Sequence, residues 1–170
     1  MMIENSRFFT EDPADKLSDL DEGSIDLVVT APPSYSEDRY SKEYLDHSYC
    51  WDSLSDYLEY MERVFTEVYR VLKNQHYCII TVGDTNTFYG KRQWEKKTYP
   101  LAAHFINLLE WIGFTYVSEY TLDKGGKALT DKCRSAYYPF MLSPVSSNEH
   151  VLIFVKKGDI DKPVPCPRCG

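Results

Sequence analysis

The sequence predicts an α/β fold, about half of a doubly wound sheet, from three observations. Short apolar runs alternate with amphipathic helical patterns in the order strand, helix, strand, helix, strand, loop, strand. The first run, at 25–30, is nearly continuously apolar, as in parallel strands that are covered on both faces. The last two strands, at 114–122 and 149–156, are expected to pair antiparallel. With 170 residues, 43% of them hydrophobic, the chain is long enough for one domain with a core.

The remaining elements follow from apolar spacing and from residues that begin or end helices. Pro13 is suited to open a short first helix. A long helix capped by Asp52 or Ser53 is predicted next, because apolar residues recur every three or four positions at Leu54, Leu58, Met61, Phe65, Val68 and Leu72. A strand at 76–82 ends in Gly83-Asp84, and a basic loop occupies 85–99. Pro100 then begins a helix that Gly113 ends.

The net charge of −7 is unevenly distributed along the chain. Residues 1–62 hold 16 acids and 4 bases, whereas residues 63–170 hold 10 acids and 15 bases. Clustered bases with an interleaved tryptophan suit phosphate contact and base stacking, although solvated loops are the alternative interpretation. The candidate DNA-binding residues are Lys91, Arg92, Trp94, Lys96, Lys97, Lys124, Lys127, Lys132 and Arg134.

The five cysteines do not indicate a disulfide framework, because their number is odd and no secretory signal precedes them. Cys78 lies inside an apolar strand and is expected in the core. Cys166 and Cys169 form a Cys-Pro-Arg-Cys-Gly knuckle that can supply two of the four ligands of a zinc ion, so the others would lie outside the chain; a surface dithiol is the alternative. We therefore divide the chain into 1–160 and a linker or start of a zinc ribbon at 161–170. A cytoplasmic location is expected.

The first strand ends in the segment Thr30-Ala31-Pro32-Pro33-Ser34-Tyr35, which is a candidate site. Open α/β sheets bind ligands at the carboxyl ends of their strands. Two prolines stiffen the backbone there, and an adjacent aromatic ring can stack on a planar ligand. A simple turn after the strand is the alternative interpretation.

Segment 24–35 resembles motif IV, the catalytic loop of the SAM-dependent DNA amino-methyltransferases that modify N4 of cytosine or N6 of adenine. The resemblance continues in the same order along the chain. The further segments that resemble this family are 67–73, 80–84, 99–103 with Gly113-Phe114, and 148–156. The occurrence of these segments in the family's order makes the resemblance specific. Motif IV alone would not.

The resemblance implies a partial Rossmann-like methyltransferase sheet that lacks the SAM-binding half. It also implies methyl transfer to an exocyclic amino group of a flipped base, with a polar side chain and a backbone carbonyl accepting hydrogen bonds from that group. Two positions depart from the pattern. Ala31 replaces the polar residue, and Ser34 replaces the stacking aromatic, whose role Tyr35 would take. The Thr-x-Pro-Pro form favours N4-cytosine.

The family's SAM-binding segment, with its Phe-x-Gly-x-Gly loop, is absent from the sequence. We therefore expect S-adenosyl-L-methionine to bind at a site completed by a second polypeptide or a downstream segment, with Asn5, Thr30 and Asp84 as contacts on this chain. Without that segment, one edge of the 25–30 strand should lie bare. The alternative hypotheses are a degenerate subunit that binds DNA or a partner, and an unrelated nucleotide-binding domain.

Overall fold

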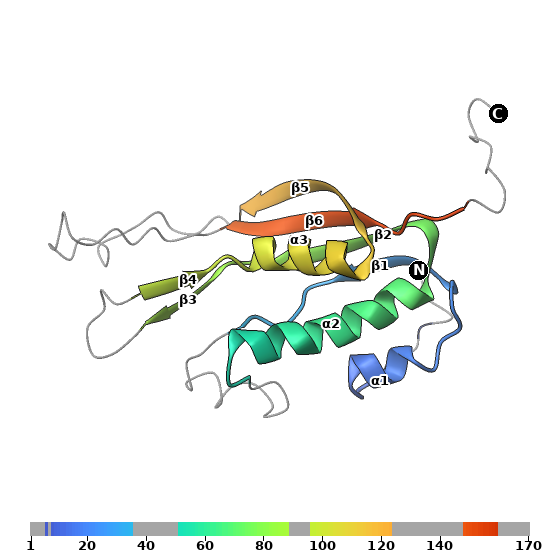
Figure 1. The fold of residues 1–170 in the computed structure, drawn as a ribbon, viewed down its shortest axis with the longest axis horizontal. Helices are drawn as coiled ribbons and strands as arrows, with labels where there is room; N and C mark the ends of the chain where they lie inside the picture. Colours follow the sequence, from blue (N-terminus) through green and yellow to red (C-terminus); the bar gives the residue numbers. More distant parts are fainter. Residues whose placement is uncertain (1–5, 7, 36–50, 89–95, 124–147, 160–170) are drawn as a thin grey trace, which may run out of the picture.

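The computed structural model describes residues 6, 8–35, 51–88, 96–123 and 148–159. Four strands form one sheet in the order β1-β2-β6-β5, and two more form a separate hairpin (Figure 1). The helices are α1 (Pro13–Leu17), α2 (Leu54–Val71) and α3 (Leu101–Ile112). The strands are β1 (Ile25–Thr30), β2 (Leu72–Val82), β3 (Thr85–Phe88), β4 (Lys96–Tyr99), β5 (Thr115–Asp123) and β6 (Asn148–Val155).

The sheet has the mixed topology that the sequence predicts. β1 and β2 are parallel and are joined by α2, which forms the crossover. β6 lies between β2 and β5 and is antiparallel to both. The predicted antiparallel pair of last strands is therefore confirmed. β1 lies at the edge of the sheet, with β2 as its one neighbour among the described strands.

The structure differs from the sequence prediction at two junctions. Helix α2 passes into β2 without a loop, so Leu72 is the first residue of the strand rather than part of the helical stripe. Its N-cap is Ser53, whose hydroxyl accepts a hydrogen bond from the Asp56 amide at 3.1 Å. The segment 85–99, predicted as a basic loop, contains the paired strands β3 and β4. The apolar pattern misses this hairpin because its strands are short and polar.

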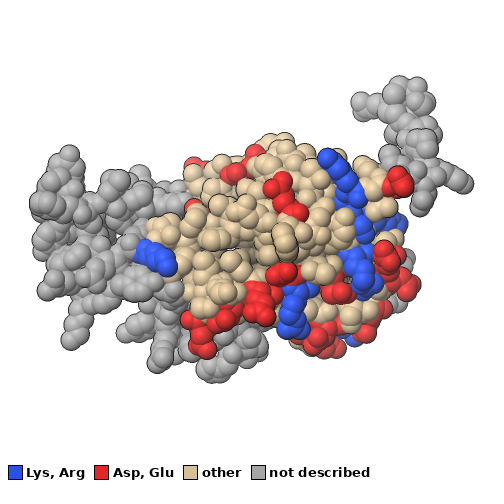
Figure 2. All heavy atoms as spheres, viewed as in Figure 1, with Lys and Arg blue, Asp and Glu red and all other residues tan. Residues whose placement is uncertain are grey.

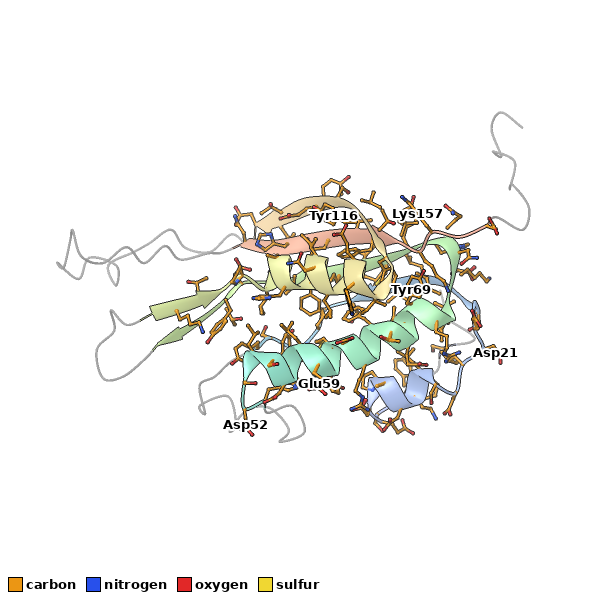
Figure 3. All side chains as sticks on the ribbon, in the orientation of Figure 1. Asp21, Asp52, Glu59, Tyr69, Tyr116 and Lys157 are labelled. Atoms are coloured by element: carbon orange, nitrogen blue, oxygen red, sulfur yellow. The ribbon has the colours of Figure 1, made fainter. Side chains whose placement is uncertain are left out.

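One ammonium group stabilises the direct step from α2 to β2. Lys156, just after β6, is buried, and its Nζ donates to the carbonyl oxygens of Tyr69 (2.7 Å), Arg70 (3.3 Å) and Leu72 (2.8 Å). These carbonyls lie at the helix end, where intrahelical donors run out and a positive charge is favoured. The same ammonium lies 4.8 Å from the centre of the Tyr69 ring, which is labelled in Figure 3.

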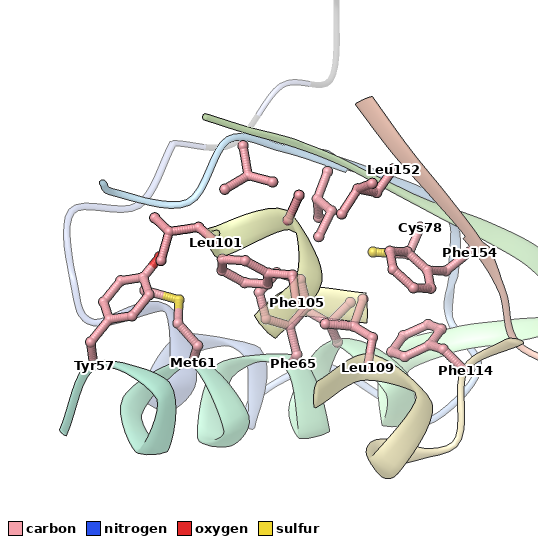
Figure 4. Close-up of a cluster of buried hydrophobic side chains, with 14 of the residues drawn as sticks. Tyr57, Met61, Phe65, Cys78, Leu101, Phe105, Leu109, Phe114, Leu152 and Phe154 are labelled. Carbon is pink, nitrogen blue, oxygen red and sulfur yellow. The ribbon is translucent and has the colours of Figure 1, made fainter. Parts of the chain in front are cut away.

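The hydrophobic core lies between α2, α3 and one face of the sheet. Phe105 of α3 is fully buried and meets the rings of Phe65 (5.7 Å) and Tyr57 (6.2 Å) edge-on, as Figure 4 shows. The sheet contributes its inward-facing side chains to this core: Cys78, Ile80, Val82, Leu152 and Phe154. The prediction that Cys78 is a core residue is confirmed, and burial raises the pKa of its thiol to about 12.

The opposite face of the sheet is apolar and open. Leu27 and Val29 of β1 are 54% and 66% exposed, and Tyr77, Tyr120 and Leu122 on the neighbouring strands are also exposed. The strand register places all of these side chains on one face, which we call the open sheet face. No described helix covers it. The expectation that β1 is covered on both faces is therefore wrong for this chain as the structure describes it. No helix among the described residues is both long and apolar enough to cross a membrane.

We predict that replacing Phe105 with Ala destabilises the fold by about 3–5 kcal/mol, because it leaves a cavity between two helices and the sheet. Trp111 lies on the same helix but is 81% exposed. Trp111→Ala should therefore change stability by no more than about 0.5 kcal/mol. Urea unfolding of both variants measures the difference. Equal losses would contradict the placement of α3.

Candidate functional site

The candidate loop follows β1 at the carboxyl edge of the sheet. Thr30 is the last residue of β1 and pairs with Ile80 of β2. Thr30 to Pro33 line a cavity of about 690 Å³ that lies between β1, α1 and α2. Most of its other lining is apolar, including Val28 of β1 and Met61 of α2. The cavity is lined by the β1 side chains that face α2, including Val28 and Thr30, and β1 is the strand at the edge of the described sheet.

The loop side chains differ in their exposure to solvent. Ala31 and Ser34 are exposed, whereas Thr30, Pro32 and Pro33 are half-buried. The exposed position 31 carries only a methyl group, so it has no side-chain acceptor for an amino group. The hydroxyl of Ser34 is the polar side chain that the loop exposes to solvent.

Tyr35 does not offer a free ring to a ligand. Its side chain is fully buried, with ring centres 5.6 Å from Tyr57 and 5.1 Å from Tyr99. Packing of apolar ring surface in an aromatic cluster explains this burial. The expectation that Tyr35 stacks on a flipped base does not fit this geometry, and Tyr35 instead anchors the end of the loop. The Tyr57 hydroxyl also holds the loop, since it donates to the Pro33 carbonyl oxygen at 3.0 Å.

A second polar group lies at the ends of β2, β5 and β6. Asp84 follows β2, and its carboxylate lies 4.0 Å from Nε2 of His150 and 3.5 Å from the Ala102 amide at the start of α3. The other ring nitrogen of His150 is hydrogen-bonded to Glu119 of β5. Sequence analysis missed Glu119, because nothing in the spacing links it to a histidine 31 residues later.

Many of the candidate residues lie outside the part of the chain that the structure describes. Of the basic residues, Lys97 is described, and its ammonium lies 4.2 Å from the centre of the Tyr99 ring. Lys96 is placed in β4 by its backbone only. The candidates outside the described residues are Asn5, Lys91, Arg92, Trp94, Lys124, Lys127, Lys132, Arg134, Cys166 and Cys169. Within the described residues, no three His, Cys, Asp or Glu side chains are grouped closely enough to hold a metal ion.

Figure 2 shows acidic side chains gathered over α1 and α2. An acidic surface repels the phosphate backbone of DNA, so these two helices are poorly suited to contact it. The β3–β4 hairpin, whose strand β4 includes Lys96 and Lys97, lies at the end of the sheet where the candidate loop also lies (Figure 1).

The sequence of this chain is similar to those of known proteins. A family model described as DNA methylase, of the N6/N4 type, matches residues 25–165. The chain is 26% identical over 151 residues to the Type II beta methyltransferase M.BslI of Bacillus sp. (strain NEB-606), a match that covers 86% of this chain and 16% of that protein. It is 34% identical over 77 residues to the Type II methyltransferase M.SfiI of Streptomyces fimbriatus, covering 45% of this chain and 18% of that protein.

Solved structures share the fold. A protein of Thermus thermophilus, described as a DNA modification methylase and solved with S-adenosyl-L-methionine, superposes with a TM-score of 0.65 at 24% identity. That match covers 90% of this chain and 54% of the Thermus protein. The cytosine-N4-specific PvuII DNA methyltransferase superposes with a TM-score of 0.59 at 17% identity, over 86% of this chain and 48% of its own. The chain thus spans about half of these solved structures and under a fifth of the two curated relatives.

Proposed function

Because the chain belongs to the N6/N4 DNA methylase family, we propose that it supplies the catalytic loop of a SAM-dependent methyltransferase that modifies an exocyclic amino group of DNA. Family membership sets aside the hypothesis of an unrelated nucleotide-binding domain. The observation that carries the proposal is the loop from Thr30 to Ser34, which follows the carboxyl end of the edge strand β1 and lines, with Thr30 to Pro33, the cavity between β1, α1 and α2.

The chemistry needs a target nitrogen that can attack the methyl group. The lone pair of an exocyclic amino nitrogen is delocalised into the base, so hydrogen-bond acceptors must draw the nitrogen toward tetrahedral geometry. In this loop, backbone carbonyls fixed by two prolines are the acceptors that we propose, with the exposed Ser34 hydroxyl as a second candidate. The Thr-x-Pro-Pro form of the loop favours cytosine N4 over adenine N6 as the target.

We propose that SAM binds at a site that a second polypeptide or a further segment of the protein completes. The open sheet face and the free edge of β1 support this proposal. In doubly wound sheets, helices cover both faces, and ligands bind where the strand order reverses. Here β1 is the edge from which the sheet would continue, with Thr30 and Asp84 as contacts from this side, together with Asn5.

A second candidate function is a degenerate subunit that retains the fold and binds DNA or an active partner. Two observations favour it. The exposed position 31 carries no acceptor, and Tyr35 is buried rather than available for stacking. Measuring the activity of loop variants, as set out at the end of this subsection, distinguishes the two functions.

We predict that the isolated chain binds SAM weakly or not at all, and that a polypeptide carrying the family's SAM-binding segment restores binding. Val29→Glu, on the open sheet face, should abolish this assembly, because it would bury an unpaired charge. Thr66→Glu, on the exposed surface of α2, is the matched control and should leave assembly intact. Calorimetric titration measures both steps. Low-micromolar SAM affinity of the chain alone would contradict the proposal.

The basic residues at 91–97 are proposed DNA contacts. Replacing Lys91, Arg92, Lys96 and Lys97 together with Ala in the assembled protein should weaken DNA binding and reduce the slope of log affinity against log salt by up to about four. The control removes Lys73 and Lys157, which lie at the opposite end of the sheet, where β2 begins and β6 ends. An equal change of slope in the control would indicate that the basic residues at 91–97 form a solvated loop without specific DNA contacts.

The methyltransferase proposal is tested most directly at position 31. Ala31→Ser or Ala31→Asp restores a side-chain acceptor, so the rate of methyl transfer should rise by up to about 10²-fold, mainly in the chemical step. The assay is single-turnover transfer from labelled SAM to duplex DNA with the completing segment present. Loss of activity in Ser34→Ala without a gain at position 31 would assign the acceptor to Ser34. Inactivity of every variant would favour the binding subunit.

A further inference from the structure

The catalytic loop is held by a phenol that lies on a different element. Tyr57 is in the first turn of α2 and is fully buried. Its hydroxyl donates to the carbonyl oxygen of Pro33, 24 residues earlier, at 3.0 Å. A buried phenol hydroxyl requires a polar partner, and here that partner is the backbone of the loop itself. The ring of Tyr57 is therefore fixed by the helix while its hydroxyl fixes the loop.

The surrounding rings leave Tyr57 little freedom to move. The N-cap Ser53 begins the helix, and the Tyr57 amide donates to the Ser53 carbonyl oxygen at 3.2 Å. The ring of Trp51 meets Tyr57 edge-on at 4.8 Å, and Phe105 of α3 meets it from another side. Burial raises the pKa of the Tyr57 phenol well above its usual value, so the hydroxyl remains a proton donor at any pH where DNA methylation is measured.

Two restraints then bracket the short loop. At one end, Thr30 is held by the β1–β2 pairing. At the other end, the Pro33 carbonyl is held by Tyr57, and the next anchor is the ring of Tyr35 between Tyr57 and Tyr99. The residue before a proline is confined to extended backbone, and each proline has a fixed φ. The peptide groups between the two restraints therefore have few directions left in which to point.

We propose that Tyr57 is a positioning residue of the catalytic loop, whose hydrogen bond to Pro33 sets the direction of the loop carbonyls. This inference rests on the proposed function, because the loop carbonyls matter for catalysis only if they accept hydrogen bonds from the target amino group. Because Tyr57 is fully buried, we assign it no contact with the base or SAM. It acts through the backbone. Loss of its hydrogen bond would let the loop carbonyls move, and a displacement of an acceptor by about 1 Å can lower the rate by up to about 10²-fold.

The test compares two variants that each remove one phenol hydroxyl from α2. Tyr57→Phe removes the bond to Pro33. Tyr60→Phe is the matched control, because the Tyr60 hydroxyl bonds the Asp12 carboxylate at 3.2 Å instead of the loop. In the isotope-labelled full chain, Tyr57→Phe should shift the Pro33 carbonyl resonance and speed amide exchange at Ser34, whereas Tyr60→Phe should change neither. An unchanged Pro33 resonance would overturn the proposal.

The same variants are then measured in the assembled enzyme. Tyr57→Phe should lower the single-turnover rate by about 10- to 100-fold while leaving DNA and SAM affinities unchanged. Full activity of Tyr57→Phe would overturn the positioning role. Failure of the proposed function is distinguishable, because the wild-type assembly would then be inactive while the Pro33 shift persists. If Tyr57→Phe does not fold, the exchange of the Tyr57 hydroxyl proton with solvent is measured in the wild-type chain. Slow exchange and a contact of this proton with Pro33 support the hydrogen bond, and their absence overturns the proposal.

Discussion

The arrangement of the whole domain depends on one buried cation at the end of α2. The helix passes into β2 without a loop, which leaves its last carbonyl groups without intrahelical donors, although the Gly23 amide donates to the Arg70 carbonyl at 3.1 Å. The ammonium of Lys156 satisfies three carbonyls at this junction from the end of β6. β6 is anchored there and pairs along β2. The position of the candidate loop follows from the parallel pairing of β1 with β2, which places Thr30 beside Ile80.

The candidate site combines a rigid backbone with an unusual set of side chains. The pairing of β1 with β2 holds one end of the loop, and the Tyr57 hydrogen bond and the buried ring of Tyr35 hold the other. The side chains that the loop exposes, those of Ala31 and Ser34, are small. Main-chain groups are therefore the most strongly oriented polar groups of the site. A loop of this kind favours catalysis through backbone acceptors, or binding without catalysis, over a mechanism that depends on a side chain at position 31.

The sequence predicts the elements that form the core and much less of the site. Helix α2 is visible in the sequence because its buried face imposes an apolar period on the chain, and β1 is visible because its run is almost entirely apolar. The β3–β4 hairpin could not be predicted from an apolar period, because its strands are short and polar. The sequence correctly predicts that position 31 directly follows a strand, because the motif segment follows the apolar run at 25–30. The roles of Tyr35 and Tyr57 could not be predicted, because the ring cluster joins residues that only the folded chain brings together.

The open sheet face also bears on how this polypeptide behaves before the proposed completing segment binds. Among the described strands β1 has one free edge and displays Leu27 and Val29 beside exposed aromatic rings, so a second copy of the same strand can add to it. If a second polypeptide supplies that segment, self-association and correct assembly would compete for one surface, and the ratio of the two polypeptides would decide which prevails. Synthesis of this chain in excess would then favour aggregation.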